Sequence, residues 1–447
     1  MKRIMIAGTG SGSGKTTVTC AILQALKNRG LMPVSFKCGP DYIDPMFHSE
    51  ILGTDSFNLD SFFCGRDMIM QLLDKHGKNA DISLIEGVMG YYDGGGGSAY
   101  EIAQMTETNV ILVIDCKGMS ESIGAIMKGF LTFKQKNNVI GFIFNKLPLR
   151  LISLAEGLCR ELNTEFFGIM PQSDFVFESR RLGLVTPDEI SDIKRKMENL
   201  GILAEENIFI DKLLRFSDTP LPDYSYFEIS PLFYDNKPRI AIAHDEAFCF
   251  IYKDNIALLK KLGCTIEFFS PIHDSQLPAD ICGLILYGGY PEHYLAQLSS
   301  NKTMIESIKK AINCKIPTIA ECGGFMYLHE NIIDESGKKY PFAGVIQGTV
   351  FKKNKLTRFG YVNLLAENNS LLFKKSDNIA AHEFHYYDSE NNGSDLTAIK
   401  PDGRNWKCGH CSEFMYAGFP HIFFYTNMQI AERFARACGR FGGLKNE

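Results

Sequence analysis

The chain has 447 residues, 45% of them hydrophobic, and a net charge of −5 at neutral pH. Single hydrophobic cores stop growing near about 250 to 300 residues, so two or three domains are expected. The charge offers no polycationic surface for nucleic acid and no basic anchor for a membrane, so we expect small-molecule partners. No apolar run approaches about 18 residues, and no signal-peptide pattern precedes the first strand, which predicts a cytoplasmic protein with its thirteen cysteines reduced.

The first predicted strand, residues 4–7, opens into a glycine-rich loop and a helix. Alternate glycines let backbone N–H groups converge on a phosphate, and the helix N-terminus adds its positive pole. Lys15 would reach the β- and γ-phosphates, and the Thr16 hydroxyl would ligate Mg²⁺. Thr9 stands where the GxxxxGK[ST] pattern has its first glycine, and a plain glycine-rich turn is the competing interpretation. ATP binding is predicted for Gly10, Ser11, Gly12, Ser13, Gly14, Lys15, Thr16 and Thr17.

A second strand, residues 32–36, leads into the loop KCGPDYIDP at 37–45. In open α/β sheets the carboxyl ends of the strands are where ligands bind. Asp41 and Asp44 are therefore either turn formers beside proline or functional acids, and we favour a Mg²⁺ ligand for Asp41.

A third strand, residues 82–85, ends in Glu86 and a loop with four consecutive glycines at 94–97. A carboxylate at the end of a strand beside the phosphate loop is typical of a Mg²⁺ ligand in phosphoryl transfer, so Glu86 is a metal candidate. The glycines indicate a substrate-facing loop or a plain linker. Strands at 109–115 and 139–144, separated by a helix at about 119–136, predict a parallel, doubly wound sheet. Asn145 is either an adenine ligand or an ordinary strand-end residue.

Prolines at 220, 222, 231 and 238 predict an extended connector over residues 216–238, between domains at 1–215 and 239–447. A new series then begins, with strands at 239–243, 265–269 and 281–286 and a helix at 252–262. Its last strand runs into a glycine pair, Gly288 and Gly289. This alternation predicts a second α/β domain.

The next strand, residues 316–320, leads into Glu321, Cys322 and Gly323. A cysteine at a tight strand-to-helix turn has the mechanics of a nucleophile elbow, and the helix N-terminus would lower the pKa of its thiol. The N–H groups of Gly323 and Gly289 are the candidate oxyanion donors. A buried structural thiol is the competing interpretation. Near the C-terminus, His382, His385 and His421 compete as the base, and a Cys–His pair on an α/β sheet predicts acyl transfer.

These motifs together resemble the cobyrinate a,c-diamide synthase family of glutamine-dependent amidating enzymes. The resemblance covers nearly the whole chain and rests on GTGSGSGKTT at 8–17, KCGPDYIDPMFH at 37–48, FNLD at 57–60, EGVMGYYDG at 86–94, YGGYPE at 287–292, AECGGFMYL at 320–328 and HEFHYY at 382–387.

The resemblance implies two doubly wound α/β sheets: an ATP-dependent synthetase domain similar to dethiobiotin synthetase and a class I-like glutamine amidotransferase domain. Cys322 matches the family's nucleophile and His421 its histidine, although the family's second histidine is Phe423 here. ATP, L-glutamine and cobyrinate are the implied partners, with Mg²⁺ at Thr16, Asp41 and Glu86. Substrate binding and phosphoryl transfer are assigned to Asp41, Tyr42, Asp44 and Asp93.

Two alternatives stay open. The same amidation on nickel-sirohydrochlorin or hydrogenobyrinate would carry nearly the same motifs. A P-loop ATPase switch that gates partner binding would lack the Cys322 elbow, so a glutaminase assay separates it from an amide synthase.

Overall fold

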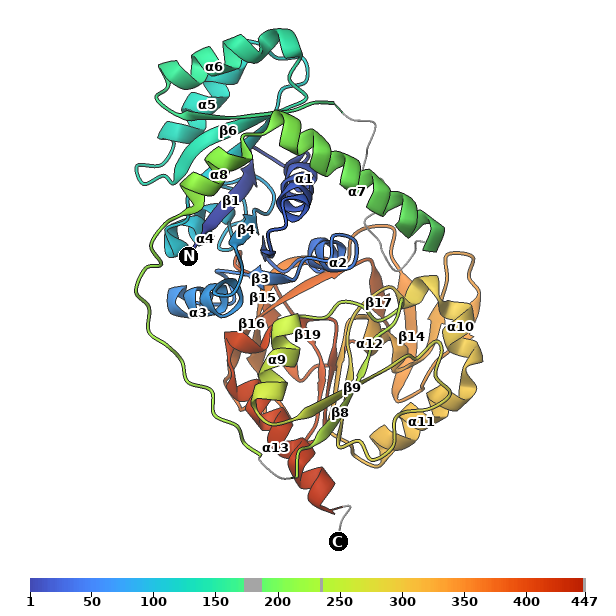
Figure 1. Ribbon diagram of the computed structural model, residues 1–447. Coiled ribbons are helices and arrows are strands. Elements are labelled where there is room, and N and C mark those ends of the chain that lie inside the picture. The colour runs from blue at the N-terminus through green and yellow to red at the C-terminus, as the bar shows by residue number, and fades with distance from the viewer. Residues whose placement is uncertain (173–186, 234–235, 445–447) are drawn as a thin grey trace. The chain divides into compact units, whose positions relative to one another are not determined.

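The computed structural model describes residues 1–172, 187–233 and 236–444. The described chain divides into two compact units, Met1–Phe227 and Glu228–Glu447, each built on a largely parallel sheet (Figure 1). The prediction of two α/β sheets is therefore confirmed. Within the described residues, no helix has both the length and the apolar character required to cross a bilayer.

The first unit is a seven-stranded sheet in the order β3-β2-β4-β1-β5-β6-β7, parallel throughout. Its central strands β1 and β5 are buried along nearly their whole length and mostly apolar because helices cover both faces of such a sheet. The strands are β1 (Arg3–Gly8), β2 (Pro33–Cys38), β3 (Ser56–Leu59), β4 (Ile82–Glu86), β5 (Val110–Asp115), β6 (Val139–Asn145) and β7 (Glu165–Met170). The chain order reverses at β1, which is where parallel sheets of this type open a crevice for ligands.

The helices of the first unit follow the strands in alternation. Helix α1 packs extensively along α7, and its buried face joins the core that includes Ile4, Leu84 and Val113. The helices are α1 (Lys15–Asn28), α2 (Ile43–Glu50), α3 (Arg66–Gly77), α4 (Ala99–Thr106), α5 (Ser122–Thr132), η1 (Leu149–Leu151), α6 (Ile152–Glu161), α7 (Pro187–Asn207) and α8 (Ile210–Ser217).

Residues 216–227, which the sequence assigns to the connector, bind the first unit. The Asn109 side chain donates to the Phe216 carbonyl at 2.9 Å, and the buried Arg3 guanidinium donates to the Pro220 carbonyl at 2.8 Å. Gln71 exchanges two hydrogen bonds with the backbone of Phe227. The domain limits at 215 and 239 stay a prediction.

The second unit is built on a six-stranded sheet in the order β20-β21-β11-β10-β8-β9, parallel except for β20. Its strands are β8 (Arg239–Ala243), β9 (Thr265–Phe269), β10 (Gly283–Leu286), β11 (Thr318–Glu321), β20 (His410–Cys411) and β21 (Met415–Gly418). Its helices are α9 (Lys253–Lys261), η3 (Pro291–His293), α10 (Leu295–Ser300), α11 (Lys302–Asn313), α12 (Gly323–Tyr327), η4 (Phe424–Thr426) and α13 (Gln429–Leu444).

After β11 the chain forms two further sheets that the sequence analysis did not predict (Figure 1). One contains β12 (His329–Ile333), β13 (Lys339–Pro341), β14 (Ile346–Lys352) and β17 (Tyr387–Ser389). The other contains β15 (Arg358–Ala366), β16 (Asn378–His385), β18 (Leu396–Ile399), β19 (Asn405–Cys408) and β22 (His421–Ile422). The antiparallel pairing of β16 with β22 sets His382 opposite His421 and so connects the later sheet to the elbow region.

Candidate active sites

The glycine-rich loop connects β1 to α1 and has the backbone that a phosphate cradle requires. Gly12 and Gly14 adopt φ angles of 78° and 90°, which favour glycine. The Asn145 amide nitrogen donates to the Ser13 carbonyl at 3.0 Å and lies 2.1 Å from where a Cβ on Gly14 would stand. Asn145 therefore braces the loop from β6, and its contact with adenine stays a prediction.

Below the loop, Thr16 and Glu86 meet as the sequence predicts. The Thr16 hydroxyl donates to Glu86 Oε1 at 2.6 Å, and the Glu86 side chain is completely buried. Parallel pairing of β2, β4 and β1 brings the ends of these strands together. A hydroxyl and a carboxylate in contact are oxygen donors of the kind that Mg²⁺ shares with nucleotide phosphates.

A buried lysine is the feature of this site that the sequence analysis missed. Lys37 Nζ lies 2.6 Å from Asp44 Oδ2, 2.9 Å from Glu86 Oε1 and 4.0 Å from Asp41 Oδ2. Burial alone would lower the pKa of this ammonium, but the three carboxylates outweigh burial and raise it above its ordinary value. Lys37 is therefore charged and forms buried ion pairs with Asp44 and Glu86.

Asp41 and Asp44 play different local parts. Asp41 Oδ1 accepts from the backbone N–H groups of Ile43 and Asp44, at 2.8 and 3.2 Å, and so caps the start of α2. Burial and the Asp44 charge raise the pKa of Asp41 to about 6, against the opposing effect of Lys37. Asp44 is buried against Lys37, and Tyr42 is buried beside it. The turn-forming role of Asp41 is present, and its part in metal binding stays a prediction.

His48, one turn after Asp44 on α2, also faces Glu86. Its Nε2 lies 3.5 Å from Glu86 Oε2, and its Nδ1 shares a hydrogen bond with the Ser35 hydroxyl at 2.9 Å. The sequence analysis did not single out His48. The signal that could have identified it is the i, i+4 spacing of Asp44 and His48, which places both residues on one helix face.

The loop after β4 approaches the phosphate cradle at one point. A Cβ on Gly90 would lie 3.2 Å from the Gly10 Cα and 2.4 Å from Asp93 Oδ2. Asp93 accepts from the Gly90 N–H at 3.1 Å, so its carboxylate fixes the turn that approaches the cradle. A direct role of Asp93 in phosphoryl transfer stays a prediction.

In the second unit, Cys322 occupies the strained turn expected of an elbow. Its φ of 49° and ψ of −104° are unusual for a residue with a Cβ, and its N–H donates to the Gly418 carbonyl at 2.8 Å. The expectation of a lowered pKa is wrong. Burial, followed by the charge of Glu292, raises the pKa of the Cys322 thiol, and the hydrogen bond from the Gly323 backbone, which lowers it, does not compensate. The resting side chain is therefore a thiol.

The glycines around the elbow lie in close contact. A Cβ on Gly288 would stand 2.6 Å from His421 Cε1 and 3.4 Å from Cys322 Cβ, so only glycine allows the histidine and cysteine to approach there. A Cβ on Gly323 would stand 3.1 Å from the Gly289 backbone nitrogen. The two predicted oxyanion donors, Gly289 and Gly323, therefore come together beside Cys322.

The three candidate histidines differ in their surroundings. His421 is buried next to the cysteine, and its ring stacks on His382 at a centroid distance of 5.0 Å. His385 instead stacks on Phe419 at 3.9 Å and bonds the Tyr387 carbonyl through Nδ1 at 2.6 Å. Burial lowers the pKa of His421 to about 3 and that of His382 well below its ordinary value. Only His421 combines a neutral imidazole with a position against Gly288 and Cys322.

Glu321, the residue before the elbow, is a second feature that the sequence analysis missed. Its side chain is completely buried; Oε1 accepts from the Ile422 N–H at 3.1 Å, and Oε2 lies 3.7 Å from His421 Nδ1. Burial raises the pKa of Glu321 to about 8. The sequence signal that could have identified Glu321 is a charged residue at the end of an apolar strand.

Each of the two units matches a known protein family. A family described as a CobQ/CobB/MinD/ParA nucleotide binding domain matches residues 4–184, and a CobB/CobQ-like glutamine amidotransferase domain matches residues 239–428.

Three relatives that align with this chain over nearly their full length carry the same name. The cobyrinate a,c-diamide synthase of Caldanaerobacter subterraneus subsp. tengcongensis is 37% identical, covering 98% of each chain. That of Priestia megaterium is 34% identical over 98% of this chain and 97% of its own, and that of Listeria innocua is 38% identical over 96% and 98%. The resemblance drawn from the motifs is confirmed, and the chain belongs to the cobyrinate a,c-diamide synthase family.

Proposed function

We propose that the chain amidates the a and c side-chain carboxylates of cobyrinate, using ATP and L-glutamine, and forms cobyrinate a,c-diamide in corrin biosynthesis. The observation that carries the proposal is that one chain combines a phosphate cradle over a buried acid cluster with a cysteine held against a histidine and two oxyanion donors. The names of the full-length relatives supply the substrate.

Ammonia is released in the second unit. The Cys322 thiol transfers its proton to His421 as sulfur attacks the amide carbon of glutamine, and the N–H groups of Gly289 and Gly323 hold the oxyanion. The carbon–nitrogen bond then breaks, and His421 returns the proton to the departing ammonia. Water attacks the thioester while His421 accepts a proton from it. The carbon–sulfur bond then breaks, His421 returns that proton to the Cys322 sulfur, and glutamate leaves. A neutral resting His421 suits this sequence because it must accept a proton first.

The carboxylate is activated in the first unit. The backbone N–H groups of the 10–14 loop and Lys15 hold the ATP phosphates while a carboxylate oxygen of the macrocycle attacks the γ-phosphorus, forming an acyl phosphate and ADP. Ammonia then attacks the acyl carbon, and the phosphate leaves with the carboxylate oxygen. The positive charge of Lys37 offsets part of the negative charge of Asp41, Asp44 and Glu86.

Mg²⁺ fits the oxygen donors at this site. Thr16 and Glu86 are already in contact, and Asp41 lies at the edge of the same cluster, so these three would hold the ion together with phosphate oxygens and water. When bound, Mg²⁺ would offset the negative charge that develops on the phosphates during transfer.

The experiment is mass spectrometry of the macrocycle after incubation with the protein, ATP and glutamine. Two successive gains of one amide each on cobyrinate are expected. Nickel-sirohydrochlorin and hydrogenobyrinate are run in parallel, and a preference for either would replace cobyrinate as the substrate. ATP hydrolysis without glutaminase activity would instead favour a switch ATPase.

A further inference from the structure

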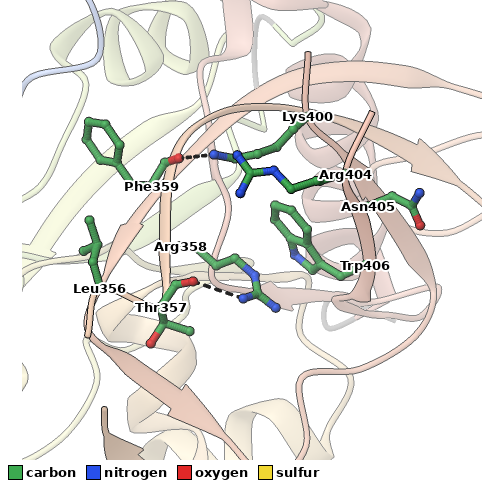
Figure 2. A pocket seen from close by; sticks show the side chains of 8 residues that line it. All are labelled: Leu356, Thr357, Arg358, Phe359, Lys400, Arg404, Asn405 and Trp406. Carbon is green, nitrogen blue, oxygen red and sulfur yellow. Dashed lines mark hydrogen bonds between the residues drawn. The ribbon is translucent and has the colours of Figure 1, made fainter. Parts of the chain in front are cut away.

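The second unit contains an open pocket of about 620 Å³ between the start of β15 and the turn that connects β18 to β19. Figure 2 shows Lys400 and Arg404 on one side of Trp406 and Arg358 on the other, while the Phe359 ring points away from the indole. The Arg358 guanidinium stacks over the Trp406 ring, 4.5 Å from its centroid. The pocket therefore combines a flat aromatic surface with three cations.

Two of these cations form no ion pair within 4 Å in the described part of the chain, although Lys400 feels the charge of Asp402. Arg358 donates to the Thr357 carbonyl at 3.0 Å, and Lys400 donates to the Phe359 carbonyl at 2.5 Å, both of which are uncharged. Arg404 pairs with Asp402, but both side chains are largely exposed, and such pairs contribute little. In a chain of net charge −5, this pocket concentrates positive charge.

Exposed aromatic side chains also lie on the other face of this sheet. Phe359, Phe384 and Tyr386 are 54%, 48% and 46% exposed, and Phe359 meets Phe384 edge to face at 5.5 Å. Neighbouring residues of a strand point to opposite faces, and the register places Phe359 and Phe384 on one face and Arg358 and Trp406 on the other. These aromatic rings are therefore not part of the pocket.

We propose that the pocket binds the carboxylate-bearing edge of a flat, polyanionic macrocycle. The inference rests on the proposed function, because a tetrapyrrole with several peripheral carboxylates is the planar polyanion that this enzyme handles. Its ring system suits the Trp406 indole, and its carboxylates, spread around the rim, suit cations placed on both sides of Trp406.

A nucleotide is the competing planar anion, but the geometry favours the macrocycle. A triphosphate is typically bound where backbone N–H groups and a lysine converge on one point, as in the glycine-rich loop of the first unit. The pocket instead separates Arg358 from Lys400 and Arg404 and lines the space between them with an indole.

The test is direct binding of cobyrinate to the full-length protein by calorimetry, without ATP or glutamine, so that it does not depend on turnover. Arg358→Gln and Lys400→Gln should each raise the Kd several-fold, and the double variant about tenfold or more. Arg358→Lys, which keeps the cation, should retain part of the affinity.

Lys407→Gln is the matched control, because Lys407 lies on the same strand as Trp406, pairs with Glu367 at 2.6 Å and does not line the pocket. Its Kd should stay within about twofold of wild type. Circular dichroism checks that each variant is folded. Trp406 is the one tryptophan of the chain, so a change in its emission on adding cobyrinate gives a second readout.

Equal Kd values in the pocket variants and the control would overturn the inference, while two-step amidation by the wild type would leave the proposed function standing. A variant effect on ATP binding but not on cobyrinate binding would assign the pocket to a nucleotide and also overturn it. If the wild type binds cobyrinate nowhere, the inference fails, and the mass-spectrometric assay reports separately whether the proposed function fails with it.

Discussion

Glu321 Oε2 lies 3.7 Å from His421 Nδ1, inside the protein and next to the cysteine of the elbow. This distance is longer than a hydrogen bond but within range of an ion pair, so the contact strengthens when the imidazole gains a proton. Burial keeps Glu321 protonated toward neutral pH, with a pKa of about 8. The positive charge that His421 gains with the Cys322 proton would therefore favour release of the Glu321 proton to solvent, and the resulting carboxylate would stabilise the imidazolium.

The first prediction is that Glu321→Gln lowers kcat for glutamine hydrolysis by about 10- to 100-fold with a smaller effect on KM, because the amide cannot become an anion beside His421. Amidation driven by ammonium salt should continue. Steady-state glutaminase assays across pH measure the effect, with the exposed Glu413→Gln as control. Equal kcat in both variants would remove Glu321 from the reaction.

The second prediction concerns stability against pH. The folded-state pKa of Glu321 is raised above its unfolded value, so its contribution is complete below about pH 4.5 and is lost as pH rises toward 8. His421 has a lowered pKa, so its contribution is complete above about 6.5 and is lost as pH falls toward 3. Urea unfolding should therefore show a smaller loss of stability between pH 5 and pH 8 in Glu321→Gln than in the wild type. An identical slope in the two proteins would contradict the pKa assignment.

The parallel sheets and the two sites were predictable from sequence because each motif follows a continuous apolar strand, and parallel strands bring their carboxyl ends to one edge. Thr16 and Glu86 met for this reason. Lys37 was missed because the sequence predicted that the strand ends at residue 36, whereas β2 continues to Cys38, and the burial of Lys37 depends on β2 pairing beside β4. The raised pKa of Cys322 was also beyond the sequence, since it depends on burial at the elbow and on Glu292 nearby.

The third prediction is that Lys37→Met destabilises the first unit by about 3 to 5 kcal/mol, because Asp44 and Glu86 would be left buried without their cation. Lys37→Met combined with Asp44→Asn should recover part of the loss. Lys146→Met, which removes a partly exposed pair with Asp115, should cost about 1 kcal/mol or less. Urea unfolding followed by circular dichroism provides the comparison, and similar losses in Lys37→Met and Lys146→Met would show that the cluster is hydrated.

The fourth prediction is that Cys322→Ala abolishes the use of glutamine yet keeps ATP-dependent amidation when ammonium salt is supplied. The two sets of residues lie in different units, so removal of a thiol in the second unit leaves the phosphate cradle intact. Product mass with each nitrogen source is the measurement. If the variant is inactive with ammonia as well, circular dichroism distinguishes an unfolded second unit from a mistaken separation of the two reactions.

The fifth prediction assigns the base. His421→Asn should lower glutamine-dependent turnover by about 10²- to 10⁴-fold, because it removes the group that accepts the Cys322 proton, while ammonia-dependent synthesis persists. His385→Asn should have a much smaller effect, since that ring is held by Phe419 and the Tyr387 carbonyl. Alkylation of Cys322 by iodoacetamide, followed by peptide mass spectrometry, tests the pair directly.

In the wild type this alkylation should be slow at neutral pH and rise only under alkaline conditions, because burial raises the pKa of the thiol. The exposed Cys314 serves as an internal reference in the same digest. His421→Asn should change the pH dependence at Cys322 and leave that of Cys314 unaltered. A change in His385→Asn but none in His421→Asn would identify His385 as the base, and the contact between Gly288, His421 and Cys322 would then be a matter of packing.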